Sequence, residues 1–339
     1  MQISAVDGYA RGSHADTVPV KNVYLHVTKA CNRHCGYCYF AASQPLLNEM
    51  TRMEFSRLWM GIAALRPQKV VFTGGEPLLR PDLLDLLRDF RATDPEHYIV
   101  RCLNTNGDLV TPEIAHGLVG LADEVRVSLD ALPERNDTIR GKGSFDAAMR
   151  ALGYFHAVGF EPKVLVTVTS MSVPDLYELL CFLIHKGITR ITLNLFRPIG
   201  RGVKHQDWVA EPSEVDRAVR SAWKECCREQ PLPREFANPT RHTNCGVGSF
   251  LSIMSNGNVF PCHALMFPEF RCGNVREQRL LEICHRGGLL QQLRTLDFHQ
   301  LARRDKQLAA LNGSDVCMGL VYAKTRSLPI WSNSLPLSA

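Results

Sequence analysis

Three cysteines within eight residues constrain this chain more than any other feature of its sequence. They lie in the segment Cys31-Asn-Arg-His-Cys35-Gly-Tyr-Cys38, directly after the apolar residues 23–27. Thiolates are the usual ligands of iron–sulfur clusters, and a short spacing on one loop places several of them around a single site. Three thiolates ligate three irons of a cubane cluster and leave the fourth iron open. The spacing therefore predicts an iron–sulfur site at the end of the first strand.

A structural zinc knuckle is the alternative interpretation of this segment. Zinc normally takes four closed ligands, and His34 could complete such a set with the three cysteines. The four side chains would be very cramped, however, and no paired CxxC lies nearby in the sequence. The segment therefore favours an iron–sulfur cluster over zinc.

The bulk composition is that of an ordinary globular protein. The chain has 339 residues, of which 45% are hydrophobic and 22% are charged, and its net charge is +5. So mild a charge does not predict nucleic-acid binding. Residues 1–19 lack the apolar core of a signal peptide, and no apolar run approaches the ~18 residues of a membrane span. We therefore expect a soluble, cytoplasmic protein without nucleic-acid or membrane partners.

The twelve cysteines do not predict a disulfide framework, because the chain is not a short secreted one. In a reducing compartment, clustered cysteines bind metal or do chemistry, whereas isolated ones are mostly small buried hydrophobic residues. Cys102, Cys181, Cys226 and Cys227 lie in apolar strand or helix patterns. We interpret these four as structural.

Strand-like and helix-like segments alternate over the first part of the chain. A capping box at Thr51-Arg-Met-Glu54 and a Thr111-Pro112 pair each predict the start of a helix between two strands. Repeated β-then-α units imply right-handed crossovers and a mostly parallel sheet, which we expect to curve into a partial (β/α)6 TIM-like barrel of the α/β class. Ligands of such folds gather at the carboxyl ends of the strands, where the cysteine segment falls. The predicted strands are residues 22–28, 69–73, 98–103, 124–129, 163–169 and 190–196.

A change of character after residue 201 predicts a second, smaller domain. Residues 213–228 still have a helical pattern, but several prolines between residues 231 and 239 mark a linker. Further on, apolar residues 249–254 and 259–262 flank Asn256-Gly257, which is the strongest short-range hairpin signal. The expected organisation is an N-terminal extension at 1–20, the barrel with its linker helix at 21–235, and a hairpin-containing domain with a C-terminal tail at 236–339.

A glycine turn follows the second predicted strand. Gly74, Gly75, Glu76 and Pro77 stand directly after the apolar residues 70–72. Two glycines allow a backbone to approach a ligand closely, Glu76 can accept a hydrogen bond from a cationic amine, and Pro77 fixes the exit of the chain. Alone this turn is a weak signal, but at a strand end after a CxxxCxxC segment it is specific.

Together the two motifs resemble the radical S-adenosylmethionine (SAM) superfamily, over residues 21–201. The resemblance implies that Cys31, Cys35 and Cys38 bind a [4Fe–4S] cluster whose open iron chelates SAM. One-electron reduction, by a donor such as flavodoxin or ferredoxin, then cleaves SAM to methionine and a 5′-deoxyadenosyl radical that abstracts hydrogen from a substrate. The cofactors carry the difficult chemistry, and the protein supplies position, dryness and electrostatics.

The same resemblance assigns further residues to the SAM site. Tyr37 would lie near the adenine, and Ser128 and Arg140 would contact the ribose or the carboxylate of SAM, as a bidentate arginine can. Asn104 follows the third strand and joins this set, and the turn at residues 198–201 lies where substrate or adenine contacts are expected. The alternatives are an ordinary core aromatic for Tyr37, a capping role for Ser128 and a solvated side chain for Arg140.

A second cysteine set resembles the SPASM/twitch extension, which holds one or two auxiliary iron–sulfur clusters in many radical SAM enzymes. Cys245 and Cys262 flank the predicted hairpin, but the paired cysteines that continue a full SPASM pattern are missing. The favoured interpretation is one auxiliary [4Fe–4S] cluster on Cys245, Cys262 and Cys317, with Cys272 as a further candidate ligand. A degenerate domain that kept the hairpin and lost the cluster is the alternative. Cys284 falls in an apolar helical pattern and is expected to be core.

The resemblance implies an enzyme without identifying its substrate or its catalytic residue. Radical SAM enzymes with such extensions commonly modify ribosomally made peptides by cross-linking, epimerisation or oxidation, while others oxidise an aminoglycoside or act in cofactor synthesis. We expect a peptide substrate, with a small molecule as the alternative. Few residues precede the first strand, so a precursor-binding module is expected to be a separate protein.

A non-catalytic iron–sulfur protein, either a redox sensor or an electron carrier, is an alternative of a different class. Residues 74–77 argue against it, because a carrier needs no SAM-binding glycines and would saturate its cluster with four cysteines. Metal analysis after anaerobic preparation separates both iron–sulfur interpretations from a zinc-stabilised binding module.

Overall fold

A computed structural model describes residues 20–226, 247–286, 288–294 and 317–326. Within them, nine strands form one sheet in the order β6-β5-β4-β3-β2-β1-β7-β8-β9. The first six strands pair in parallel, and β7 continues this parallel pairing on the free side of β1. The strands are β1 (Asn22–Thr28), β2 (Lys69–Gly74), β3 (Val100–Thr105), β4 (Glu124–Ser128), β5 (Lys163–Val168), β6 (Ile191–Leu195), β7 (Phe250–Ile253), β8 (Asn258–Phe260) and β9 (Gly273–Asn274).

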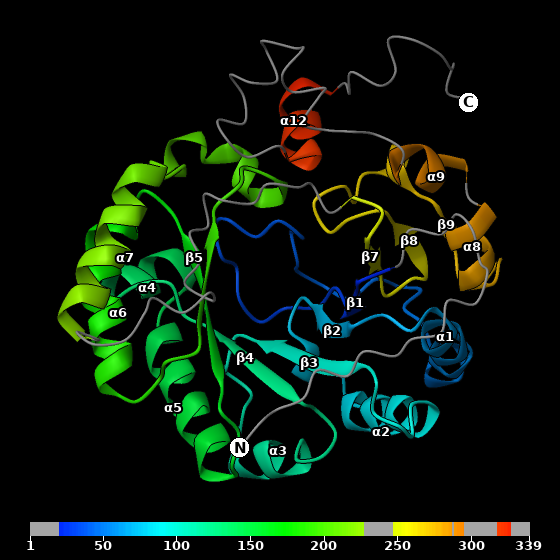
Figure 1. The fold of residues 1–339 in the computed structure, drawn as a ribbon, viewed down its shortest axis with the longest axis horizontal. Helices are drawn as coiled ribbons and strands as arrows, with labels where there is room; N and C mark the ends of the chain where they lie inside the picture. The colour runs from blue at the N-terminus through cyan, green and yellow to red at the C-terminus, as the bar shows by residue number, and fades with distance from the viewer. Residues whose placement is uncertain (1–19, 227–246, 287, 295–316, 327–339) are drawn as a thin grey trace, which may run out of the picture.

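Helices cover the outer face of the curved sheet, and the segment after β1, drawn in blue, lies inside the ring (Figure 1). This is a mixed α/β partial barrel, as the sequence predicts. All six predicted barrel strands are present, each within two residues of its expected start. The helices are α1 (Arg52–Leu65), α2 (Leu83–Thr93), α3 (Pro112–Gly117), α4 (Pro133–Arg140), α5 (Ser144–Ala157), α6 (Val173–His185), α7 (Pro212–Cys226), α8 (Leu280–Arg286), α9 (Gly288–Arg294) and α12 (Met318–Thr325).

Local caps start the helices where the sequence predicts. Thr51 accepts from the backbone N–H of Glu54 while the Glu54 side chain bonds back to Thr51, which completes the capping box of α1. Thr111 accepts from the N–H of Ile114, and Pro112 occupies the first turn of α3. These two capping signals thus set the residues at which α1 and α3 begin.

Strand β1 shows how the sheet divides its two faces. Val23, Leu25 and Val27 are fully buried in the core between sheet and helices. Because side chains alternate along a strand, Tyr24 and His26 point to the other side, which is the interior of the barrel. The hydrophobic core therefore lies outside the barrel wall, and the interior is left to polar and aromatic residues.

A buried charge cluster closes the amino end of the barrel. Glu124, at the start of β4, forms ion pairs with Arg126, with Lys69 at 3.2 Å and with Arg190 at 3.5 Å. Burial alone would raise the pKa of Glu124, but the surrounding cations, Arg126 first, outweigh it and lower the pKa to about 2. The carboxyl ends of the strands, where ligands of such folds gather, lie at the opposite end.

The predicted hairpin is present as β7 and β8, which pair antiparallel, and it extends the barrel sheet. Leu25 of β1 pairs with Ile253 of β7, so hairpin and barrel share one continuous sheet. A smaller second core, which includes Phe260, Phe270 and Met318, lies on this part of the molecule. The proposed domain division at 235/236 falls in residues 227–246, outside the described part of the chain.

No helix in the described residues combines the length and the apolar character that spanning a membrane requires.

Candidate active site

The cysteine segment forms a loop at the carboxyl end of β1. Cys35 is buried, and Cys31 and Cys38 are half-buried. The backbone N–H of Arg33 points at the Cys31 sulfur at 3.4 Å, a contact of the kind that tunes cluster ligands. Burial, with smaller contributions from Glu76, Cys35 and Cys38, raises the pKa of the Cys31 thiol to about 11. Burial also raises the pKa of Cys35, so the loop disfavours the thiolate forms of Cys31 and Cys35 until a cation neutralises them.

The donor set fits an iron–sulfur cluster better than zinc. Within the described ranges, no three His, Cys, Asp or Glu side chains stand arranged to hold a metal ion as they are. His34, the only candidate for a fourth zinc ligand on the loop, is solvent-exposed. Three thiols without a fourth donor match a cluster with one open iron.

Arg33 ties one side of the cysteine loop to the end of β3 and to the junction of α4 and α5. Its guanidinium forms a bidentate ion pair with Asp108, just beyond β3. It also donates to the carbonyl oxygens of Gly141 at 2.9 Å and Lys142 at 2.7 Å, between α4 and α5. A planar guanidinium with five donors can make such a set of contacts, whereas a lysine cannot.

Arg201 fastens the opposite side of the loop. Its backbone N–H donates to the carbonyl of Cys38 at 3.0 Å, and its guanidinium donates to the carbonyls of Cys35 at 3.1 Å and Ala42 at 2.5 Å. Gly200 precedes it with φ of +62°, and a Cβ there would lie 2.3 Å from the Tyr39 carbonyl oxygen. The turn at 198–201 thus packs on the cysteine backbone itself, a role that its sequence does not reveal.

The glycine turn also serves the loop. A Cβ on Gly75 would lie 1.9 Å from the carbonyl oxygen of Ala30, and one on Gly74 would lie 2.3 Å from that of Thr28. The Gly75 N–H donates to Thr28 at 2.9 Å, and the Glu76 N–H donates to Ala30 at 2.7 Å. The close approach that glycine permits is therefore, in this structure, an approach to the backbone that leads into the cysteine loop.

Glu76 lies at the centre of this region and is 1% exposed. Its carboxylate accepts hydrogen bonds from the Thr105 hydroxyl at 2.8 Å, from the Asn106 N–H at 2.7 Å and from the Leu78 N–H at 3.2 Å. Burial raises its pKa to about 7 in spite of these three donors. Pro77 opens the short 3-10 turn η1 (Pro77–Leu79), for which Glu76 is the cap. Glu76 thus ties the end of β2 to the end of β3.

Tyr37 and Arg140 meet in one buried cluster, with Asp130 between them. Arg140 forms an ion pair with Asp130 at 3.0 Å, and both contact the Tyr37 hydroxyl. Asp130 is fully buried and Arg140 is 7% exposed, so the interpretation of Arg140 as a solvated arginine is wrong. The second oxygen of Asp130 accepts from the Thr167 N–H at 2.7 Å. The sequence points to Tyr37 and Arg140, whereas the role of Asp130 is visible only in the fold.

Asn104 and Ser128 are half-buried at the ends of β3 and β4. The Asn104 amide donates to the Thr73 hydroxyl at 3.5 Å, a long contact that leaves the amide available. Leu132, and not Ser128, occupies the cap position of the helix that follows β4. Both residues therefore lie at the strand ends where the SAM site is expected.

The second cysteine set lies beside the first. Cys262 and Cys317 are both buried in the second core. Burial raises the pKa of each thiol, while Arg197 counteracts the increase at both, which shows that one cation faces the pair. The Cys262 sulfur also accepts from the backbone N–H of Ala264 at 3.4 Å. Cys245 lies outside the described residues.

Cys272 packs against a different core from this pair, and its interpretation as a further candidate ligand stays a prediction. After burial, the groups that shift the pKa of the Cys272 thiol are Cys284 and Arg294, and not Cys262 or Cys317. Cys284 is buried in the main core, as expected for it, and Cys272 packs against that same core. The N–H of Cys272 bonds to the carbonyl of Val259, in β8. This pairing turns its side chain toward α8 instead of toward the barrel mouth.

Aromatic and imidazole rings connect the two cysteine sites. His263 follows Cys262 and contacts Tyr39, next to Cys38, with ring centres 5.7 Å apart. Burial, together with the neighbouring His263, lowers the pKa of His26 to about 3, so the ring is neutral. His26 stacks on Phe40 at 4.4 Å, and its ring nitrogens have no hydrogen-bond partner within the described ranges. The space between the two sites is therefore lined by aromatic and imidazole rings.

Comparison with known proteins decides the family. The model of the radical SAM superfamily matches residues 25–193, and that of the SPASM iron–sulfur cluster-binding domain matches residues 245–309. The chain belongs to the radical SAM superfamily. The first match contains the cysteine loop, the glycine turn and the Tyr37 cluster, and the second contains Cys245 and Cys262. Both resemblances inferred from the sequence are confirmed.

Two kinds of curated relative are similar to this radical SAM protein. The mycofactocin maturase MftC of Mycobacterium tuberculosis is 30% identical over 267 residues, which cover 74% of this chain and 66% of the maturase. The Fe-coproporphyrin III synthase of Methanosarcina barkeri is 35% identical over 235 residues, which cover 67% of this chain and 57% of the synthase. The chain thus spans less than two thirds of the length of either relative.

Solved structures support the fold. Streptococcus suis SuiB bound to its precursor peptide SuiA aligns with a TM-score of 0.70 and 19% identity, over 83% of this chain and 68% of that one. The protein anSMEcpe with bound AdoMet and a Cp18Cys peptide aligns with a TM-score of 0.66 and 18% identity, over 80% and 81% of the two chains. At such identities the likeness concerns architecture alone.

Proposed function

We propose that this protein is a radical SAM maturase that modifies a ribosomally synthesised peptide. One observation carries the catalytic part of the proposal: Arg33, Arg201 and the glycine turn hold a three-cysteine loop at the open end of a barrel whose other end is filled by charge. Such a loop presents its ligands at the carboxyl ends of the strands, where the ligands of such folds gather.

Cys31, Cys35 and Cys38 would hold the [4Fe–4S] cluster, and the strand ends around Gly74, Gly75, Tyr37, Asn104, Ser128 and Arg140 would hold SAM. When bound, cluster and SAM together supply the radical that abstracts hydrogen. The chain's own contribution is to orient and to exclude water. Buried Asp130 keeps the Arg140 guanidinium in place by an ion pair, so Arg140 needs no reorganisation to receive a carboxylate.

Cys262 and Cys317, together with Cys245, would hold the auxiliary cluster. Arg197 favours the thiolate form of both described cysteines, which metal binding requires. Tyr39 lies between the two sites, since Cys38 and Cys262 both contribute, after burial, to the raised pKa of its hydroxyl. An electron donor such as flavodoxin or ferredoxin completes the proposed system.

A peptide substrate is favoured by the match to mycofactocin maturases, which extends over barrel and SPASM region alike. Modification of a small tetrapyrrole is the second candidate. It is favoured by the higher identity to the Fe-coproporphyrin III synthase and by a 27% match to an AdoMet-dependent heme synthase of Nitratidesulfovibrio vulgaris over 81% of this chain.

The first test is cleavage of SAM by anaerobically reconstituted protein with dithionite, measured as 5′-deoxyadenosine by chromatography. We expect nucleoside from the wild type and none from the Cys31→Ala, Cys35→Ala, Cys38→Ala variant. A wild type with a full iron load that forms no nucleoside, with or without substrate, would contradict the proposal.

The second test separates the two substrates. Candidate precursor peptides and Fe-coproporphyrin III are added in parallel, and both the rate of nucleoside formation and the mass of the substrate are followed. A decrease in peptide mass through loss of hydrogen supports the proposed maturase function. A mass change confined to the tetrapyrrole supports the second candidate and overturns the first.

A further inference from the structure

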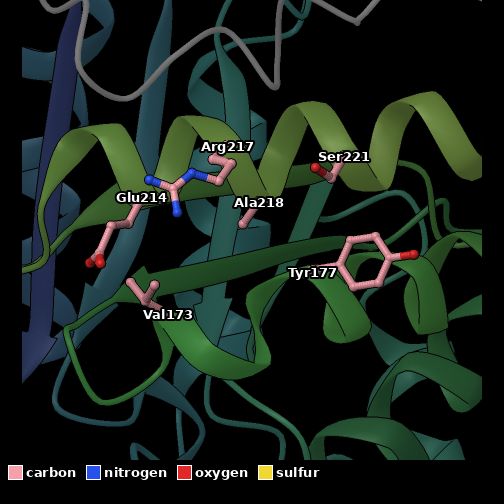
Figure 2. A pocket seen from close by; sticks show the side chains of 6 residues that line it. All are labelled: Val173, Tyr177, Glu214, Arg217, Ala218 and Ser221. Atoms are coloured by element: carbon pink, nitrogen blue, oxygen red, sulfur yellow. The ribbon is translucent and has the colours of Figure 1, made fainter.

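Helices α6 and α7 pack side by side on the outer wall of the barrel, away from the cysteine loop. A shallow pocket of about 410 Å³ opens between them, lined by Val173 and Tyr177 of α6 and by Glu214, Arg217, Ala218 and Ser221 of α7. Figure 2 shows the two sets of side chains facing one another along this seam. Residues four apart share a helix face, so the next turn of α6 along the seam brings Cys181 to it.

Cys181 meets Cys226 of α7 at the end of the seam. The two sulfurs are 2.9 Å apart, and both thiols are free and half-buried. A disulfide bond needs about 2.0 Å between sulfurs, so bond formation requires a shift of less than about 1 Å. Isolated structural cysteines have no reason to lie so close, and the sequence interpretation of both as core residues does not account for the contact.

We propose that Cys181 and Cys226 form a redox-active dithiol, a modification site that closes to a disulfide between α6 and α7. This inference is independent of the proposed peptide or tetrapyrrole substrate. The pair belongs to neither cysteine set of the active site, since both residues lie on helices outside the barrel wall.

The chemistry needs a small-molecule disulfide as the oxidant. The thiolate of one cysteine attacks this disulfide, forms a mixed disulfide and releases one small thiol. The second cysteine then attacks the mixed disulfide, so that the Cys181–Cys226 bond forms and the second small thiol leaves. The protein loses two protons and two electrons, and the oxidant is reduced to two thiols.

The surroundings of the pair set its reactivity. Burial, followed by the contact with Cys226, raises the pKa of the Cys181 thiol to about 12. The Tyr177 hydroxyl and the Glu225 carboxylate, which bond to each other, lie next to the pair. Closure is expected to be faster in alkaline than in neutral solution, because only the thiolate attacks.

The position of the pair gives the bond a structural consequence. Cys226 is the last residue of α7, and from there the chain continues toward the SPASM region. A Cys181–Cys226 bond ties this exit point to α6 and closes a loop across 45 residues of sequence. The oxidised protein is expected to unfold at a higher temperature than the reduced one, by about 5 °C.

The test uses the cluster-loaded full chain under anaerobic conditions. Protein is treated with oxidised glutathione, free thiols are blocked with N-ethylmaleimide, and tryptic peptides are analysed by mass spectrometry. We expect a linked peptide that carries Cys181 and the segment 225–228, formed in most molecules and removed by dithiothreitol. The absorbance of the clusters serves as the control that their ligands have not been oxidised.

Cys227 provides the matched control, because trypsin leaves Cys226 and Cys227 on the same short peptide. The Cys227→Ser variant should give the same linked peptide and the same rise in unfolding temperature. The Cys226→Ser and Cys181→Ser variants should reduce the linked peptide at least about tenfold and abolish the rise. A link that persists in Cys226→Ser, a bond between Cys226 and Cys227, or no link in the wild type would each overturn the proposal.

Discussion

At the scale of single residues, Glu76 combines a functional expectation with a measurable structural role. The sequence suggests a carboxylate that accepts from a cationic amine, but in the fold its two oxygens receive three donors of the chain itself. Burial nevertheless dominates, since the pKa is raised to about 7. The folded protein therefore favours the protonated form of Glu76 over the ionised form.

This preference predicts a pH-dependent stability. Between the ordinary pKa of a glutamate, about 4.3, and the folded value, the native chain holds a proton that the unfolded chain releases. The contribution of Glu76 to stability is thus fully present below about pH 4.3 and is lost as the pH rises through about 7. Shifts of this size correspond to about 3 kcal/mol.

The measurement compares wild type with Glu76→Gln by denaturant unfolding between pH 5 and 8. The variant cannot titrate at this position. As the pH rises from 5 to 8, the wild type should therefore lose up to about 3 kcal/mol of unfolding free energy relative to the variant. Parallel pH curves for the two proteins would show that Glu76 does not titrate in this window.

At the scale of elements, the end of β2 depends on the absence of a side chain. The Gly75 position approaches the Ala30 carbonyl so closely that no Cβ fits without a backbone shift. Gly153, in the exposed face of α5, has open space around it. The two glycines therefore provide a matched pair for the same substitution.

We expect Gly75→Ala to cost about 3 kcal/mol of unfolding free energy and to reduce iron loading, because the displaced backbone leads into the cysteine loop. Gly153→Ala should stabilise the chain by about 0.5–1 kcal/mol, since alanine favours a helix interior. Chemical denaturation and iron analysis measure both effects. Equal stability and equal iron content in the two variants would mean that β2 does not support the loop.

The elements that the sequence predicts well are those with local signals. Apolar strand runs, the Thr51 capping box, the Thr111-Pro112 start and the Asn256-Gly257 turn each act within a few residues, and each is present in the fold. Arg201 is different, because its partners Cys35 and Ala42 lie more than 150 residues away in the sequence. No local pattern encodes such a contact.

At the scale of the whole molecule, the same limit explains what the sequence leaves open. Cysteine spacing predicts the loop at Cys31–Cys38, but it does not say against which core a distant cysteine such as Cys272 packs. The parallel pairing of β7 with β1 also escapes prediction. This pairing matters, because it fixes the hairpin, and with it Cys262, beside the first cysteine loop.

The continuous sheet leads to a prediction about iron. If Cys262 and Cys317 hold an auxiliary cluster, the Cys262→Ala, Cys317→Ala variant should lose about half of the iron, provided that both clusters are of the [4Fe–4S] type. The Cys272→Ala, Cys284→Ala variant removes one half-buried and one buried thiol outside this pair and should keep all of the iron. Iron and sulfide analysis with electron paramagnetic resonance of the reduced proteins distinguishes one cluster signal from two.

Because the first loop is held by Arg33, Arg201 and the glycine turn, both variants should still cleave SAM. Equal iron in the two variants would contradict an auxiliary cluster at Cys262 and Cys317 and favour a SPASM region that has kept its hairpin without its metal.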